Sequence, residues 1–148
     1  MKIHYEGYFY QDEKAALEVA KNEYLKHFKI SNNFIFLIHS VSEQESRSLN
    51  QHYFKKDTPA DVLTVPLYKN IDTIRKLDKD NVEILGDLFF NRKLIKSNAV
   101  KYKKTMNEEL QLVLIHGLLH LVGFSHENED RLKKIENKVL NKVWKDAK

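Results

Sequence analysis

The amino-acid sequence predicts an α+β fold, in which a small mixed sheet of about four strands packs with four to five helices around a buried, histidine-bearing helix. Two patterns support this class. Short runs of branched and aromatic residues alternate with segments of helical periodicity. Residues 106–122 are apolar on every face, as in a helix enclosed by a core. The 148 residues contain no repeat or linker, so we expect a single domain over residues 1–148.

The first half of the chain alternates strand and helix patterns. We expect a strand at 2–10, a helix at 12–28, a strand at 34–38, a helix at 43–53 and a strand at 61–65. Residues 34–38 are continuously apolar, which predicts a strand buried on both faces. Ser42 and Glu45 have the spacing of a capping box before the second helix. Pro66 cannot donate a ladder hydrogen bond, so we expect the third strand at a sheet edge.

The second half begins with a polar loop and contains the strongest helix. We expect the loop at 69–81, a strand at 83–90, a weak helix at 91–104, a core helix at 106–122 and a last helix at 128–144. Thr105 and Glu108 form a second capping box directly before the core helix. Gly123 follows that helix and can adopt the left-handed conformation that ends many helices.

Composition narrows the possible chemistry and location. The chain has no cysteine, which excludes disulfides, thiolate metal sites and cysteine nucleophiles. The amino terminus lacks the apolar region of a secretory signal, and no apolar run reaches the roughly 18 residues of a membrane span. We therefore expect a cytoplasmic protein without a membrane partner. The net charge of +4 mildly favours a polyanionic partner.

Three histidines at the end of the core helix are the main chemical feature. His116, His120 and His126 lie within the segment HGLLHLVGFSH. His116 and His120 are one helical turn apart, so both imidazoles can reach one ion, and Gly123 lets the chain bring His126 back toward them. Three imidazoles leave a fourth position for water or substrate, as in catalytic zinc sites. The spacing therefore predicts one Zn²⁺ per chain.

The same histidines are compatible with two roles that need no metal. A buried imidazole costs free energy unless it has a partner, and a hydrogen-bonded polar cluster or a metal-free catalytic histidine would also supply one. The spacing also resembles the zinc-binding helix of metzincin peptidases. Their glutamate after the first histidine is the general base, and Gly117 stands there in this chain. Peptidase activity is therefore disfavoured.

Three segments in a fixed order carry a family resemblance. Residues 116–126 match the pattern H-G-x-x-H-L-x-G-[YF]-x-H at every fixed position. Residues 49–64 resemble L-N-x-x-Y-R-x-K-D-x-x-T-[DN]-V-L-[ST], and residues 85–88 resemble L-G-D-I. On these segments the sequence resembles the YbeY family of bacterial endoribonucleases, the ribosomal RNA maturation factors.

The resemblance implies a zinc-dependent endoribonuclease that is specific for single-stranded RNA. Its implied roles are maturation of the 16S rRNA 3′ end and ribosome quality control, with single-stranded rRNA and the ribosomal small subunit as partners. It implies that His116, His120 and His126 are the zinc ligands. The family's arginine after the tyrosine is Phe54 here, and its aspartate before the last histidine is Ser125. A ribosome-associated metalloprotein with weak or no nuclease activity is therefore the alternative, and another metallohydrolase is the third class.

Lysines near these motifs are candidates for contacts with RNA. Lys55 and Lys56 are the cations nearest to Phe54 and could bind phosphate or act in catalysis. Residues 101–104 interleave lysines with Tyr102 and could line an RNA path by charge and stacking. The alternative is that both segments are solvated turns or loops.

Three aspartates are candidates for supporting the histidines. Asp57 or Asp61 could orient an imidazole or activate water, although aspartates at strand starts often cap turns. Asp87 could accept a hydrogen bond from an imidazole, or it could belong to a turn or bulge beside Gly86.

Overall fold

The computed structural model describes residues 1–146, without the side chains of His126 and Asp146. The four strands are β1 (Lys2–Glu6), β2 (Ile35–Val41), β3 (Val62–Pro66) and β4 (Ile84–Asn91). They form one sheet in the order β1-β2-β4-β3. β1, β2 and β4 are parallel, whereas β3 is antiparallel to β4. The predicted α+β class and mixed sheet are confirmed.

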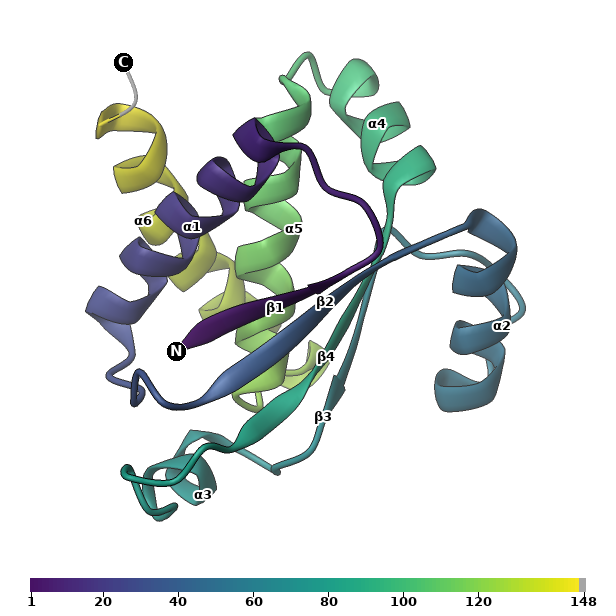
Figure 1. Cartoon of the computed structure of the whole chain (residues 1–148). Coiled ribbons are helices and arrows are strands. Elements are labelled where there is room, and N and C mark those ends of the chain that lie inside the picture. The colour runs from purple at the N-terminus through teal and green to yellow at the C-terminus, as the bar shows by residue number, and fades with distance from the viewer. Residues whose placement is uncertain (147–148) are drawn as a thin grey trace.

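Helices cover the two faces of this sheet unequally (Figure 1). The helices are α1 (Gln11–His27), α2 (Glu43–Phe54), α3 (Ile71–Arg75), α4 (Arg92–Lys101), α5 (Met106–Leu121) and α6 (Glu129–Asp146), with a short 3₁₀ helix η1 (His126–Asn128). α1 and α5 lie on one face, and α6 packs on both of them. α2 lies on the other face, against β3 and β4.

Several element boundaries differ from the sequence predictions. The first strand stops at Glu6 instead of residue 10, because Gly7 has a φ of +88° and turns the chain toward α1. The expected loop at 69–81 contains α3. Asn70 caps this helix by accepting a hydrogen bond from the Thr73 amide at 3.0 Å.

β2 is not buried on both faces, as the apolar run predicted. Phe36 and Ile38 are fully buried against the helices, but Ile35 and Leu37 on the opposite face are partly exposed. The reason is that α2 covers mainly β3 and β4. The edge position of β3, predicted from Pro66, is confirmed.

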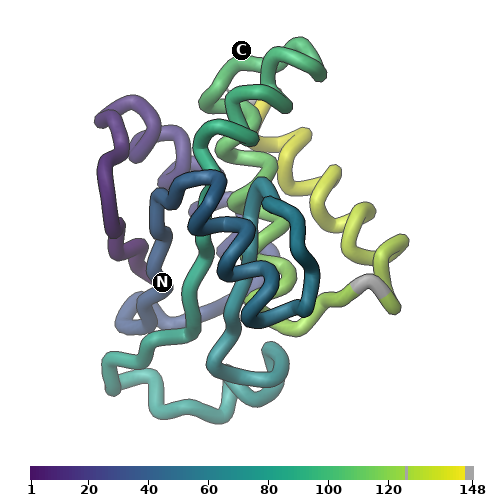
Figure 2. The backbone as a smooth tube through the Cα atoms, turned by 90° about the vertical axis from the view of Figure 1, so that its right-hand side faces the viewer, coloured from purple at the N-terminus to yellow at the C-terminus, as the bar shows by residue number. Residues whose placement is uncertain are grey.

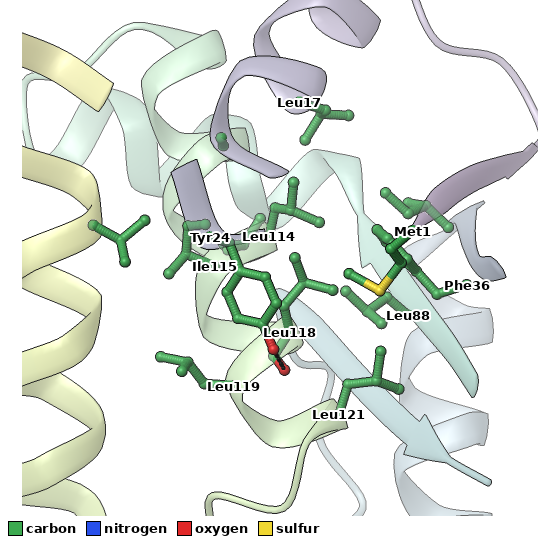
Figure 3. Packing of buried hydrophobic residues seen from close by; sticks show 14 of the residues in the cluster. Met1, Leu17, Tyr24, Phe36, Leu88, Leu114, Ile115, Leu118, Leu119 and Leu121 are labelled. Atoms are coloured by element: carbon green, nitrogen blue, oxygen red, sulfur yellow. Dashed lines mark hydrogen bonds between the residues drawn. The ribbon is translucent and has the colours of Figure 1, made fainter. Parts of the chain in front are cut away.

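α5 is the centre of the core, as its uniform hydrophobicity predicted. It contacts α1, α4, α6, β3 and β4. Leu114, Leu118 and Leu121 have no exposed surface, and the Tyr24 hydroxyl on α1 donates to the Leu118 carbonyl at 3.0 Å (Figure 3). The capping box is present, since Thr105 Oγ1 accepts from the Glu108 amide at 3.1 Å and Glu108 Oε1 from the Thr105 amide at 3.0 Å.

Two glycines fix how α5 packs and ends. A Cβ on Gly117 would lie 2.7 Å from Leu88 Cδ2 and 3.3 Å from Thr64 Oγ1, so the absence of a side chain lets α5 approach the sheet. Gly123 has a φ of +105°, the left-handed conformation expected of it. The chain then turns back, and the Phe124 amide donates to the Leu119 carbonyl at 3.0 Å.

Candidate functional site

His116 and His120 turn their imidazoles toward each other on the last two turns of α5. Their Nε2 atoms are 3.2 Å apart, and the ring centroids are 4.7 Å apart. Both side chains are partly exposed, although the helix around them is buried. The structure therefore brings these two predicted ligands together.

Each ring is held from behind by an acceptor on its Nδ1 atom. Glu136 on α6 places Oε2 2.8 Å from His116 Nδ1, and the Phe124 carbonyl lies 2.7 Å from His120 Nδ1. A carbonyl and a carboxylate accept hydrogen bonds, so both Nδ1 atoms carry the hydrogen. In neutral rings the Nε2 lone pairs then point toward one another.

This donor set fits a divalent metal. Two nitrogens bound to one tetrahedral zinc ion at 2.0–2.1 Å lie about 3.3 Å apart, close to the separation of the two Nε2 atoms. Two lone pairs at that distance repel unless a cation or a proton lies between them. A carboxylate or carbonyl acceptor behind each ring is the usual support of a metal-binding histidine.

Acidic groups surround His116 and stabilise positive charge there. The hydrogen bond to Glu136 raises the pKa of His116, burial of the ring opposes this, and Asp61 and Glu129 add to the rise. The same negative potential would favour a bound cation. The neighbourhood of His116 is therefore suited to positive charge.

The backbone of His126 follows the histidine pair directly, at the start of η1. Ser125 precedes it, and the Ser125 amide donates to Asn128 Oδ1 at 2.7 Å, which fixes the turn. The His126 side chain lies outside the described residues. Among the side chains that are described, no group of three or more histidines, aspartates and glutamates is placed so that all of them could hold one metal ion.

Asp61 is the predicted aspartate that lies in electrostatic range of His116. Its Oδ1 accepts from the Val62 amide at 2.8 Å, as in a local turn cap. Asp61 directly precedes β3, and β3 packs on α5, where Thr64 Oγ1 donates to the Gly117 carbonyl at 3.2 Å. In Figure 2 the connection 55–61 lies between α2 and the turn that joins α5 to α6.

Asp57, Lys55 and Lys56 occupy that connection and are exposed. Asp57 pairs with Arg47 at 2.8 Å, and this hydrogen bond lowers the pKa of Asp57. The Asp57 carboxylate therefore accepts from Arg47, and among the described side chains no histidine donates a hydrogen bond to it. Lys55 ends α2 in the left-handed conformation, and its Nζ lies 3.5 Å from the His52 carbonyl.

Asp87 lies within β4, and its carboxylate accepts a hydrogen bond from an imidazole, as predicted. The imidazole is that of His39, at 2.7 Å, and not that of a histidine on α5. The ring of His39 also stacks on Phe89 with the centroids 4.5 Å apart. His39 and Phe89 line a hollow of about 610 Å³ next to α2, on the sheet face opposite α5. Asp87 therefore belongs to a different part of the molecule from the α5 pair.

The lysine-rich segment 101–104 lies between α4 and α5, at the far end of α5 from His116. Lys101 and Lys104 lie 5.3 and 6.0 Å from the ring centroid of Tyr102, and Lys104 also pairs with the buried Glu109 at 3.6 Å. These contacts pair Lys101 and Lys104 with groups of the protein itself, as in an ordinary loop.

Sequence reasoning missed Glu136, although a signal was present. Leu132, Val139 and Val143 form the buried stripe of α6, and Glu136 falls on this stripe as a partly buried acidic residue. A charge on the apolar face of a helix needs a partner inside the protein. The pattern therefore pointed to a contact, but not to His116 as the partner.

The fold and the site define a class: an α+β protein whose buried core helix presents a supported histidine pair. Residues 7–144 match the family model described as Endoribonuclease YbeY, and the chain belongs to this family. Proteins named Endoribonuclease YbeY include one from Mycoplasmoides gallisepticum, 34% identical over 93% of this chain and 82% of the relative. Another, from Buchnera aphidicola, is 35% identical over 76% of this chain and 70% of the relative.

A solved structure shares the fold. The solution structure of TM1509 from Thermotoga maritima superposes with a TM-score of 0.62 at 25% identity, covering 97% of this chain and 90% of that protein. Within the part of the chain that the structure describes, none of the helices combines the length and hydrophobicity that a membrane span requires.

Proposed function

We propose that this protein is a zinc-dependent endoribonuclease that cleaves single-stranded RNA during maturation of ribosomal RNA. The family supports the nuclease activity, since the relatives carry the name Endoribonuclease YbeY. The observation that carries the metal dependence is the His116–His120 pair, with Nε2 atoms 3.2 Å apart and an acceptor behind each ring. His126 is the proposed third ligand, and residues 1–148 would act as one domain.

Different residues have different proposed roles around one Zn²⁺. His116, His120 and His126 would hold the ion, which when bound supplies Lewis acidity toward a phosphodiester oxygen and lowers the pKa of a water. Glu136 and the Phe124 carbonyl fix the two rings on α5, so that both Nε2 atoms keep their direction. Asp61, at the start of β3, is the candidate to orient or deprotonate a water near His116.

Contacts with RNA are proposed for the connection after α2. Lys55 and Lys56 are exposed there, between α2 and Asp61, and can neutralise phosphate charge. A cytoplasmic location, a role at the 16S rRNA 3′ end and in ribosome quality control, and association with the small ribosomal subunit belong to the same proposal.

One observation favours a second function. Phe54 ends α2 with 45% of its surface exposed, at the position where the family pattern has an arginine. Phenylalanine cannot engage a phosphate as a guanidinium does. The second candidate is therefore a ribosome-associated metalloprotein whose nuclease activity is weak.

Cleavage of single-stranded rRNA fragments by zinc-loaded protein tests the two functions. The nuclease proposal expects cleavage by the wild type, its loss in His120→Ala and its loss with a chelator. Identical weak cleavage by both proteins would identify a contaminating nuclease. If His120→Ala then still co-sedimented with small ribosomal subunits, the second function would be the better account.

A further inference from the structure

Three cations form a stripe along one face of α6. Arg131, Lys138 and Lys142 are seven and four residues apart, which at about 100° per residue places them within about 40° of each other around the helix. The stripe extends for about 16 Å along the helix axis. All three side chains are exposed.

The stripe borders the seam between α6 and the end of α1, two helices that pack on each other (Figure 1). A small hollow of about 120 Å³ opens at this seam, lined by Glu23, Lys26, His27, Lys138, Val139 and Lys142. His27 lines the same hollow as Lys138 and Lys142. Burial of its ring, followed by the charges of Lys138, Lys142 and Arg131, lowers the pKa of His27.

The described carboxylate that lines this hollow pairs with a lysine outside the stripe. Glu23 lines the hollow, but it is largely buried and pairs with Lys26 at 2.7 Å. Among the side chains that the structure describes, none forms an ion pair with Arg131, Lys138 or Lys142. By contrast, Lys133 on another face of α6 lies 3.6 Å from Glu129.

One end of the stripe lies beside the candidate metal site. The Arg131 guanidinium is 5.6 Å from the ring centroid of Phe124, and the Phe124 carbonyl is the acceptor that holds His120. The Phe124 ring also contacts Phe28, which neighbours His27. Arg131 is therefore the cation of the stripe nearest to the histidine pair, and Lys138 and Lys142 follow it along α6.

We propose that Arg131, Lys138 and Lys142 bind the phosphate backbone of the RNA strand that flanks the cleaved bond. This inference rests on the proposed function, since it takes the partner to be single-stranded RNA. An anionic partner matches the positive charge of the stripe, and RNA is favoured because the stripe begins beside the site where RNA would be cut. We call this row of three cations, as a binding site for successive phosphates, the phosphate track. Such a track adds affinity for long strands without reading their sequence.

Binding of fluorescent single-stranded RNA to metal-free protein tests the track without relying on catalysis. Fluorescence anisotropy is measured over a series of KCl concentrations for the wild type and for Lys138→Gln/Lys142→Gln. Removing two phosphate contacts lowers the slope of log Kd against log[KCl] by about 1.4 and weakens binding of a strand of about 16 nucleotides on the order of tenfold. The control Lys96→Gln/Lys133→Gln removes two exposed lysines away from the stripe and leaves both values unchanged.

The outcomes separate this proposal from the nuclease proposal. An unchanged slope in the stripe variant, with a circular dichroism melt equal to that of the wild type, overturns the track even if zinc-loaded protein cleaves RNA. A reduced slope supports the track even if no cleavage is detected. If only binding to vesicles of anionic lipid were lost in the variant, the partner would be a membrane surface and the RNA track would be wrong.

Discussion

One side chain from another helix and one backbone carbonyl set the direction of the two histidines. Glu136 on α6 and the Phe124 carbonyl beyond α5 each accept from an Nδ1 atom, which leaves both Nε2 atoms on one side of α5. Gly117 lies between the histidines and keeps this part of α5 against Leu88. The pair therefore depends on its supports as much as on its own spacing.

Replacing Glu136 with glutamine is expected to weaken zinc binding by about tenfold, the lower end of the usual effect of changing the partner of a metal-binding histidine, because the amide oxygen can still accept from His116 Nδ1. The glutamine keeps the size of the side chain but removes the negative charge beside His116. Competition with a chromophoric chelator measures the affinity. The exposed Glu43→Gln on α2 is the control, because Glu43 pairs with Lys93 and is not among the groups that shift the pKa of His116. Equal affinities of the two variants would contradict the role of Glu136.

The Gly117→Ala substitution is expected to destabilise the protein by about 1–3 kcal/mol, the cost of overpacking a close contact. The new Cβ would meet Leu88 Cδ2 at 2.7 Å, so α5 or β4 must shift. Urea unfolding measures the loss, with the exposed Ser97→Ala as the control. An unchanged urea midpoint for Gly117→Ala would show that α5 can move without cost.

Elements whose signals are local were the ones that the sequence predicted well. The capping boxes at Ser42 and Thr105 mark the starts of α2 and α5, because both partners lie within four residues. α3 was missed, since part of its support is distant: the Ile71 amide donates to the Val122 carbonyl at 3.0 Å. The site divides in the same way. The four-residue spacing predicted the His116–His120 pair, but Glu136 comes from another helix.

An ion pair joins the start of α1 to α4, and it predicts how the stability of the protein changes in acid. Arg92 binds the buried Glu13 through two hydrogen bonds of 2.6 and 2.7 Å. Burial opposes the ionised form of Glu13, but the hydrogen bonds from Arg92 and the Tyr10 amide prevail and lower its pKa from 4.5. The stabilisation is therefore complete above pH 4.5 and is lost as the pH falls through the lower pKa of the folded state.

Glu13→Gln tests this ion pair. The variant leaves a partly buried guanidinium without its charged partner, so we expect a loss of about 3 kcal/mol at pH 7. The gap between wild type and variant should narrow as the pH falls below 4.5, because the wild type then loses the same charge. Chemical unfolding at a series of pH values gives the two curves. A gap that stays constant down to about pH 3 would refute the assignment.

At the scale of the whole molecule, the candidate metal site joins the two helices that close the core. His116 and His120 come from α5, Glu136 comes from α6, and Asp61 approaches from the start of β3. A metal ion at this site would bind the folded protein and not the unfolded chain. The stability of the entire molecule should therefore depend on the metal.

Zinc at about 100 times its Kd is expected to raise the free energy of unfolding by about 2.7 kcal/mol over protein in a chelator. The increase should vanish in His116→Ala/His120→Ala. Denaturant unfolding in zinc buffers and in chelator gives both values. The same increase in the double variant would place the stabilising zinc elsewhere.

The most direct test of the central claim is the number of zinc ions per chain, measured by elemental analysis of protein purified without an affinity tag. Three histidines that hold one ion predict about one zinc in the wild type and a large loss in His116→Ala, His120→Ala and His126→Ala. Full zinc content in any of these three variants would contradict the assignment of that histidine. Wild-type protein that stays without zinc after incubation with the ion and gel filtration would contradict the metal centre itself.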